Sequence, residues 1–350
     1  MIKITEGKYK SIQAVADENG LIRAAAMDQR GSLRKSIAQA KGVAPEEISR
    51  EEMQEFKAEV TRALTPYASA ILLDPEFGLP AAKVRAKNSG LLLAYESTGY
   101  DTTLPGRIPT LIPGYTIRKL KEDGGNCVKF LLYYTQFEKP EVNERKKEII
   151  KQVAAECRKE DIAFFMEPVG YDVSGQKPEK GVEYAKIKPE IVIHTIEEFT
   201  KDEYGIDVLK VEIPVNLKYT EGSKSYNGKD KAYTLDQAMN YYRKAADTST
   251  KPFIYLSAGV SEEEFRENLI VAGQAGVNYA GVLCGRATWQ DGVPIYAKNG
   301  PKALAAWLRD KGVQNIQALN QILTKTAKPW YSKYGGRKNI EVVKSSEVKV

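Results

Sequence analysis

Short runs of apolar residues recur along the chain, and turn-forming or charged residues bound each run. Runs of this length with such boundaries are typical of buried β-strands. Eight of them stand out, at residues 21–27, 70–73, 91–95, 127–134, 162–166, 208–213, 253–256 and 279–284. Strands that are apolar on both faces indicate a parallel sheet with helices packed on it.

Segments with helical spacing of apolar residues lie between these strands. Ser49 and Ser261 are each followed three residues later by a glutamate, the capping-box pattern of a helix start. Further helices are predicted at residues 144–158, 235–247, 302–311 and 315–326. Alternating strands and helices, with eight strands in about 270 residues, predict an α/β fold of the (β/α)8 TIM-barrel type. A doubly wound open sheet is the alternative, but no GxGxxG sequence follows the first strand.

Most of the predicted strands end in a polar or charged residue. These residues are Asp28, Asp74, Glu96, Glu167, Ser257 and Arg286. The C-terminal ends of the strands form the functional rim of a barrel, so the six residues are candidates for one site. Each of them alone could instead cap a loop or pair with a neighbouring charge.

Two lysines, Lys129 and Lys210, stand inside predicted strands, although lysine is almost never fully buried without a partner. Because apolar residues alternate with Lys210, we expect the apolar face to meet the helices and Lys210 to point into the barrel. Burial and a second cation lower the pKa of a lysine, and an amine whose pKa lies between ~7 and ~8 can attack a carbonyl. An ion pair of Lys210 with Glu212 or Glu167 is the structural alternative, and spacing alone favours neither.

The loops after the seventh and eighth strands contain small residues and one arginine. Ser257 and Gly259 follow the seventh strand and lead into a capped helix, and Gly285 and Arg286 follow the eighth. Loops at these two positions of a barrel often bind phosphate, because small residues let backbone N–H groups approach the anion. Arg286 would add charge and a bidentate fork. In the structural alternative, the two glycines only allow tight turns.

Composition narrows the class of protein further. The 350 residues are 42% apolar and 28% charged, an ordinary globular balance, with a net charge of +6. A single histidine, His194, disfavours zinc enzymes and histidine-dependent hydrolases, so we expect no metal and treat His194 as structural. Three cysteines without a CxxC pattern indicate free thiols in a reducing compartment, and we predict a cytoplasmic protein. The sequence has no secretory signal and no apolar run of about 20 residues, which predicts no membrane association.

The chain is predicted to form one domain, residues 1–330, followed by a basic C-terminal tail, residues 331–350. The tail carries five basic and two acidic residues and is expected to be a solvated appendage. Elsewhere the charges are mixed, which disfavours nucleic acid as a partner. Two long segments at the rim, residues 97–116 and 216–231, are either mobile loops or a lid over a charged substrate.

Several longer motifs carry a resemblance to a known family over roughly residues 8–330. They are MDQRG at 27–31, LLDPEFG at 72–78, KFLLYY at 129–134, DVLKVE at 207–212, YLSAGV at 255–260 and GVLCGRATW at 281–289. On these motifs the chain resembles the class I tagatose 1,6-bisphosphate aldolases. The resemblance implies a metal-free, cofactor-free barrel that cleaves D-tagatose 1,6-bisphosphate to dihydroxyacetone phosphate and D-glyceraldehyde 3-phosphate.

The resemblance also implies residue roles. Lys210 matches the Schiff-base lysine, and Glu167 matches the general acid/base, whose pKa we expect burial to raise. Lys129, Asp28 and Gln29 match polar positions of the active site. The phosphate-binding region is matched by Ser257, Gly285 and Arg286. The implied partner is a phosphorylated ketose, and barrels of this size often form homo-oligomers.

The chain departs from the family pattern in two places. Residues 168–172, next to Glu167, differ from the usual sequence, and the tail is longer than expected. Aldolases of fructose 1,6-bisphosphate or of sulfofructose 1-phosphate therefore stay as alternatives. A phosphate-sugar isomerase, or a non-catalytic sugar-phosphate sensor on the same barrel, would not require the amine of Lys210.

Overall fold

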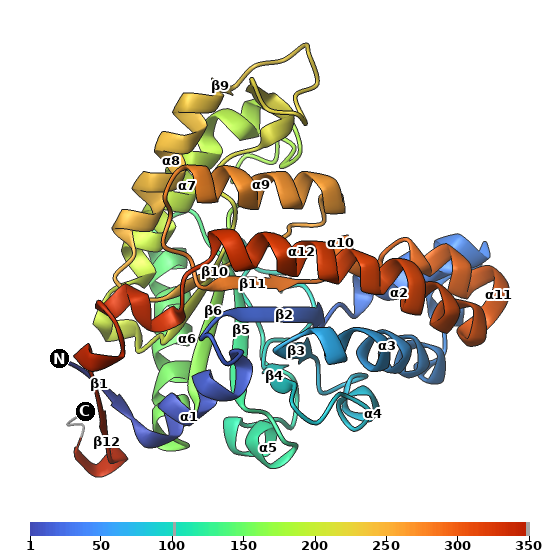
Figure 1. Ribbon diagram of the computed structural model, residues 1–350, viewed down its shortest axis with the longest axis horizontal. Helices are drawn as coiled ribbons and strands as arrows, with labels where there is room; N and C mark the ends of the chain where they lie inside the picture. The colour runs from blue at the N-terminus through green and yellow to red at the C-terminus, as the bar shows by residue number, and fades with distance from the viewer. Residues whose placement is uncertain (101–102, 348–350) are drawn as a thin grey trace.

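A computed structural model of the chain describes residues 1–100 and 103–347. Within them, eight parallel strands close a barrel in the order β10-β11-β2-β3-β4-β5-β6-β7 (Figure 1). The strands are β2 (Ile22–Met27), β3 (Ala70–Leu73), β4 (Gly90–Ala94), β5 (Cys127–Tyr133), β6 (Ala163–Val169), β7 (Val208–Val211), β10 (Phe253–Leu256) and β11 (Gly281–Cys284). The predicted TIM barrel and each of its predicted strands are therefore confirmed, with ends displaced by a few residues.

Helices connect the strands and cover the outside of the barrel (Figure 1). They are α1 (Glu6–Val15), α2 (Gly31–Lys41), α3 (Arg50–Leu64), α4 (Leu79–Ala82), α5 (Ile117–Glu122), α6 (Pro140–Lys159), α7 (Val182–Phe199), α8 (Leu235–Thr248), α9 (Glu262–Gln274), α10 (Arg286–Trp289), α11 (Gly292–Trp307) and α12 (Val313–Thr326). Ser49 forms the predicted capping box with Glu52, and the Ser261 hydroxyl caps α9. No described helix combines the length and the apolar character needed to cross a membrane.

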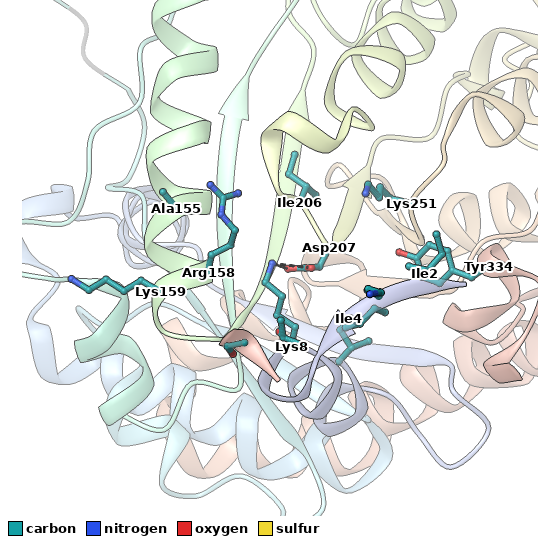
Figure 2. A pocket seen from close by; sticks show the side chains of 14 residues that line it. Ile2, Ile4, Lys8, Ala155, Arg158, Lys159, Ile206, Asp207, Lys251 and Tyr334 are labelled. Carbon is teal, nitrogen blue, oxygen red and sulfur yellow. Dashed lines mark hydrogen bonds and ion pairs between the residues drawn. The ribbon is translucent and has the colours of Figure 1, made fainter. Parts of the chain in front are cut away.

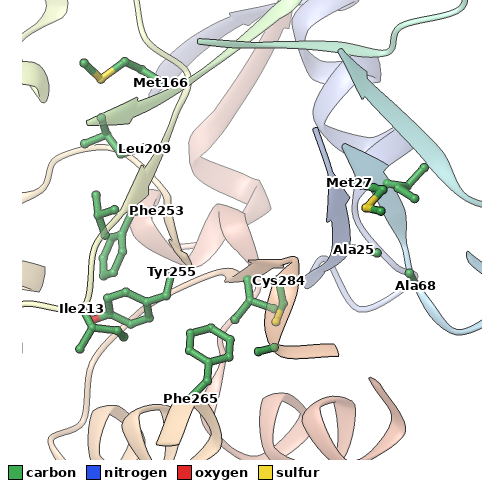
Figure 3. Close-up of a cluster of buried hydrophobic side chains, with 14 of the residues drawn as sticks. Ala25, Met27, Ala68, Met166, Leu209, Ile213, Phe253, Tyr255, Phe265 and Cys284 are labelled. Carbon is green, nitrogen blue, oxygen red and sulfur yellow. The ribbon is translucent and has the colours of Figure 1, made fainter. Parts of the chain in front are cut away.

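Alternate residues of the strands build two separate layers of core. The outer layer packs between strands and helices, and Figure 3 shows Met166, Leu209 and Phe253 of three neighbouring strands side by side in it. The inner layer includes Cys127 and Val208, the first residues of β5 and β7, and fills the barrel at the N-terminal ends of the strands. Lys129 and Lys210 continue this inner set two residues further along β5 and β7. The expectation that Lys210 points into the barrel is therefore confirmed.

The C-terminal segment packs against the N-terminal end of the barrel. Strand β12 (Ile340–Val343) pairs in parallel with β1 (Ile2–Thr5), so the first and the last strand lie side by side (Figure 1). Trp330 is fully buried, and its backbone N–H donates to Gly20 O at 2.9 Å. The expectation of a solvated appendage is wrong, because composition does not reveal a strand that pairs across the whole chain. The predicted boundary at residue 330 between one domain and a tail stays a prediction. Residues 348–350 of the tail lie outside the described residues.

Trp330 allows a direct test of how the chain ends close the barrel. Its ring packs edge-on against Tyr9 with centroids 5.8 Å apart, within the inner layer of core. Replacing Trp330 with alanine should lower the free energy of unfolding by about 3–5 kcal/mol, because it leaves a large cavity. Urea unfolding followed by circular dichroism measures the change. Phe137→Ala, at a side chain that is 52% exposed, should change stability by less than about 0.5 kcal/mol. An equal effect of the two substitutions would contradict the packing.

Candidate active site

A cavity of about 470 Å³ opens at the C-terminal ends of the strands. The sequence-predicted residues in its lining are Gln29, Glu167, Lys210, Ser257, Gly259, Gly285 and Arg286. Lys129 and Asp28 are absent from the lining, but both side chains belong to the charged cluster beneath it. The structure thus brings these nine residues together, whereas two other candidates of the rim, Asp74 and Glu96, do not line the cavity.

The centre of the cluster is a chain of alternating charges inside the barrel. The two carboxylate oxygens of Glu167 pair with different amines, Oε1 with Lys210 Nζ at 2.7 Å and Oε2 with Lys129 Nζ at 2.8 Å. Lys129 also donates to Asp28 Oδ2 at 2.9 Å and to Glu96 Oε1 at 2.7 Å. Lys210 is 4% exposed and Lys129 is 1% exposed, so these pairs are shielded from water. Of the two partners expected for Lys210, the structure selects Glu167.

The alternative partner, Glu212, is engaged elsewhere. Its Oε2 accepts a hydrogen bond from the backbone N–H of Gly170 at 2.7 Å, and its Oε1 pairs with Lys188 at 3.5 Å. Glu212 and Lys188 both line the cavity, together with Lys180 and Lys218. Glu212 therefore holds the loop after β6 in place rather than neutralising Lys210.

The electrostatics of the cluster correct one expectation. Burial acts to raise the pKa of Glu167, but the positive charges of Lys129 and Lys210 outweigh it, so the pKa lies below its ordinary value. The same two lysines, against burial, hold the pKa of Asp28 far below its usual range. Burial opposes charge on Lys129, yet Asp28, Glu167 and Glu96 raise its pKa well above normal. The two lysines thus stabilise Glu167 as a carboxylate.

Glu96 behaves differently from the other carboxylates. Burial raises its pKa, because Lys129 and a distant contact with Arg30 at 3.9 Å do not compensate. Arg30 itself is buried and pairs with Glu76 at 2.8 Å, so its guanidinium is bound by protein carboxylates. Glu96 and Arg30 therefore belong to the charged cluster around Lys129 but do not line the cavity.

The end of the cavity predicted to bind an anion is built by two loops. Ala258 and Gly259, after β10, have positive φ angles of 50° and 73°, which bring the loop against Arg286. A Cβ at Gly259 would lie 2.8 Å from Arg286 Cζ, and one at Gly285 would lie 2.9 Å from Ala26 O. Glycine is therefore favoured at Gly259 by its positive φ and at Gly285 by the close approach of a backbone oxygen. Arg286 is exposed and forms no ion pair within the described residues, so it is free to bind an anion.

Asp74 follows β3 at the rim, but it has a structural partner. It forms a fully buried ion pair with Lys57 of α3, and its Oδ1 accepts from the backbone N–H of Phe77 at 2.7 Å. Lys57 also donates to Met27 O at 2.7 Å and to Gln29 O at 2.8 Å. The pair thereby fixes the backbone on both sides of Asp28. Sequence reasoning missed Lys57, although it lies on the apolar face of its helix, four residues after Met53.

The Lys57–Asp74 pair predicts a large effect on stability. Lys57→Met should lower the free energy of unfolding by about 3–5 kcal/mol, because it leaves the Asp74 carboxylate buried and unpaired. Lys57→Met combined with Asp74→Leu should recover most of the loss, since the second change removes the orphaned charge. Lys41→Met, which breaks a more exposed pair with Glu52, should cost less than about 1 kcal/mol. Urea unfolding of the native protein and the three variants measures these differences in stability. A double variant as unstable as Lys57→Met would contradict the loss of stability being due to the unpaired Asp74 carboxylate.

The two long rim segments are attached to the barrel. In the first, Ser97 N donates to Thr110 O at 2.7 Å, and Arg107 pairs with Glu179 at 2.9 Å while lying 4.5 Å from the centre of the Tyr171 ring. In the second, β8 (Thr220–Glu221) pairs with β9 (Tyr233–Thr234). Residues 101 and 102 of the first segment lie outside the described residues. Closure of either segment over a substrate stays a prediction.

The remaining sequence candidates lie outside this cavity. His194 is on α7 and does not line it. The three cysteines are buried and unpaired. Among the described residues, no group of three or more histidine, cysteine, aspartate or glutamate side chains is arranged to hold a metal ion.

A closed eight-stranded barrel with a charged cavity at the C-terminal ends of its strands defines a (β/α)8-barrel enzyme. The statistical model of one protein family, described as "DeoC/LacD family aldolase", matches residues 22–291. This chain therefore belongs to the DeoC/LacD family of aldolases, which are carbon–carbon lyases.

Individual proteins are similar over nearly the whole chain. A "Tagatose 1,6-diphosphate aldolase" of Listeria monocytogenes serotype 4b (strain CLIP80459) is 48% identical over 343 residues, 98% of this chain and 99% of that protein. A "Tagatose 1,6-diphosphate aldolase 2" of Enterococcus faecalis is 45% identical over 95% of this chain and 98% of that protein. A solved fructose-bisphosphate aldolase of Plasmodium falciparum superposes with a TM-score of 0.66 at 14% identity, covering 91% of this chain and 94% of that one. This last likeness concerns the fold alone.

Proposed function

We propose that the chain is a class I aldolase that forms a Schiff base on Lys210 and cleaves D-tagatose 1,6-bisphosphate to dihydroxyacetone phosphate and D-glyceraldehyde 3-phosphate. The observation that carries the proposal is the 2.7 Å pair of Lys210 Nζ with Glu167 Oε1, which places a buried amine and a buried base together in the cavity. The relatives at 45–48% identity support the choice of sugar through their names. The three buried, unpaired cysteines accord with a cytoplasmic location, and assembly into a homo-oligomer stays a prediction.

The proposed reaction uses the charged cluster in a defined order. Lys210 transfers a proton to Glu167 and attacks the C2 carbonyl of the open-chain ketose. Glu167 returns this proton to the departing hydroxyl, so that water leaves, an iminium ion forms and Glu167 is a carboxylate again. Glu167 then removes the C4 hydroxyl proton, and the electrons of the breaking C3–C4 bond move into the iminium. The aldehyde departs, the enamine is protonated, and hydrolysis releases dihydroxyacetone phosphate and the free amine. Asp28 would hold a substrate hydroxyl, and Lys129 would keep Glu167 ionised between turnovers.

Arg286 is proposed to bind the 1-phosphate together with Ser257, Gly259 and Gly285. Arg286→Gln should raise the KM roughly 10- to 100-fold with a smaller change in kcat, because a charged hydrogen bond to the phosphate contributes about 1.5–3 kcal/mol. Steady-state kinetics of the purified variant measures both constants. Arg243→Gln, at an exposed position of α8, is the matched control and should change neither. An unchanged KM for Arg286→Gln would exclude this phosphate site.

The choice of sugar is tested by comparing three substrates in one assay. Cleavage of D-tagatose 1,6-bisphosphate, D-fructose 1,6-bisphosphate and sulfofructose 1-phosphate is followed by the release of the three-carbon ketone product. The proposal predicts the highest kcat/KM for the tagatose ester. A higher value for either other sugar would replace the substrate but keep the reaction class, whereas no cleavage of any of them would overturn the proposal.

A further inference from the structure

A second cavity, of about 350 Å³, lies at the opposite end of the barrel (Figure 2). Its walls come from β1, α1, the C-terminal end of α6 and residues 206–207 before β7, together with Tyr334 and Ser345 of the C-terminal segment. None of these residues lines the cavity of the proposed active site. Both ends of the chain are therefore used to enclose a space that the aldolase reaction does not need.

Part of the cavity wall is apolar. Ile4, Ile12 and Ile206 are each less than a tenth exposed, and Tyr334 adds an aromatic side chain to the lining. Cavities of 300–1,000 Å³ with apolar walls and a few fixed polar groups are typical of small-molecule sites. The cavity is large enough for an organic molecule about the size of a substituted benzene ring with one charged group.

The polar part of the lining is strongly basic. It contains Lys3, Lys8, Arg158, Lys159 and Lys251 against a single carboxylate, Asp207. Lys8 donates to both oxygens of Asp207, at 2.8 and 3.0 Å, and so neutralises it. Lys251 pairs with Asp202 at 2.5 Å, outside the lining. Arg158, Lys3 and Lys159 form no ion pair within the described residues, which leaves an uncompensated positive charge at the cavity.

Arg158 is the cation best placed to bind an anion. Figure 2 shows its side chain on the α6 side of the cavity that Ile206 and Lys8 also line. The guanidinium lies against Gly205, where φ is +56° and a Cβ atom would collide with the Arg158 side chain. A glycine thus makes room for the guanidinium, whose planar fork can bind a phosphate or carboxylate with two hydrogen bonds.

We propose that this cavity is a binding site for a small organic anion, in which a phosphate or carboxylate group is joined to an apolar or aromatic body. Arg158 binds the anionic group, and the uncompensated lysines add long-range attraction. The apolar wall of Ile4, Ile12 and Tyr334 covers the body of the ligand. Because Asp207 is already paired with Lys8, it does not repel the anion.

Phenyl phosphate is a suitable probe, because it combines one anionic group with one aromatic ring. It is titrated calorimetrically into the full-length Arg286→Gln variant, in which the proposed phosphate site of the catalytic cavity is weakened. The inference predicts one remaining site, and an Arg158→Gln substitution in this background should weaken it at least ten-fold. Arg145→Gln, at an exposed position of the same helix, should leave it unchanged. Inorganic phosphate and benzyl alcohol, each lacking half of the ligand, should bind at least ten-fold more weakly.

A second variant separates binding from misfolding. Ala155→Phe narrows the cavity without changing its charge, since Ala155 lines it from α6, and it should also weaken phenyl phosphate at least ten-fold. Loss of all binding in Arg286→Gln alone, or unchanged binding in both Arg158→Gln and Ala155→Phe, would overturn the inference. The readout is binding rather than turnover, so failure of the proposed aldolase reaction would leave this result standing.

Discussion

Replacing Lys210 with methionine should lower kcat by on the order of 10⁴-fold or more, because without the amine no iminium ion can form at C2. Lys210→Arg should be equally inactive, although it retains a positive charge beside Glu167. The two variants together separate the nucleophile from the ion pair. Initial rates at saturating ketose bisphosphate, with unfolding curves to confirm a native fold, are the measurement.

The control for this prediction is another buried lysine. Lys146 is fully buried on α6 and donates to the Tyr171 hydroxyl at 2.9 Å, outside the lining of the catalytic cavity. Lys146→Met should therefore keep activity within a few-fold of the native enzyme while it tests the general cost of removing a buried amine. Turnover above about one hundredth of the native rate in Lys210→Met would contradict the Schiff-base mechanism.

Replacing Glu167 with glutamine should lower kcat by about 10²- to 10⁴-fold, because the amide cannot accept the C4 hydroxyl proton. Covalent capture of a ketone on Lys210 should persist in this variant, at a lower rate, since the amine remains in the cavity. Rates of cleavage and of covalent capture, measured on one preparation, distinguish the two steps. Equal loss of both would instead assign Glu167 only to the activation of Lys210.

The same substitution tests the direction of the Glu167 pKa. A carboxylate whose pKa is lower in the folded than in the unfolded state stabilises the fold fully above the unfolded value, about 4.3, and loses this effect as the pH falls through the folded value. The stability difference between native protein and Glu167→Gln should therefore be largest near neutral pH and shrink below about pH 4.3. Urea unfolding at several pH values measures it, and a difference that grows towards acid would contradict the lowered pKa.

The fold could be predicted from the sequence because its signals are local. Each strand is an apolar run between turn residues, and the alternation around Lys210 was enough to place its side chain inside the barrel. The candidate site followed from the same signals, since parallel strands bring residues such as Glu167 and Arg286 to one end. Both inferences need only the period of a strand and the direction of the sheet.

Other features depend on distances that no local pattern contains. The pKa of Glu167 is lowered rather than raised because two lysines from different strands reach its two oxygens. The role of Asp74 depends on Lys57, a residue of the neighbouring helix that lies on its apolar face. The basic composition of the C-terminal segment concealed β12, whose pairing with β1 joins residues more than three hundred positions apart.

The most direct test of the central claim is reduction with borohydride in the presence of dihydroxyacetone phosphate, followed by peptide mass spectrometry. The account predicts a single reduced adduct, carried by the peptide that contains Lys210, and no adduct in Lys210→Met. An adduct on another lysine would assign the role of nucleophile to that lysine instead of Lys210. If the ketone binds but no lysine is modified, the chain does not work through a Schiff base, and the proposed mechanism is wrong.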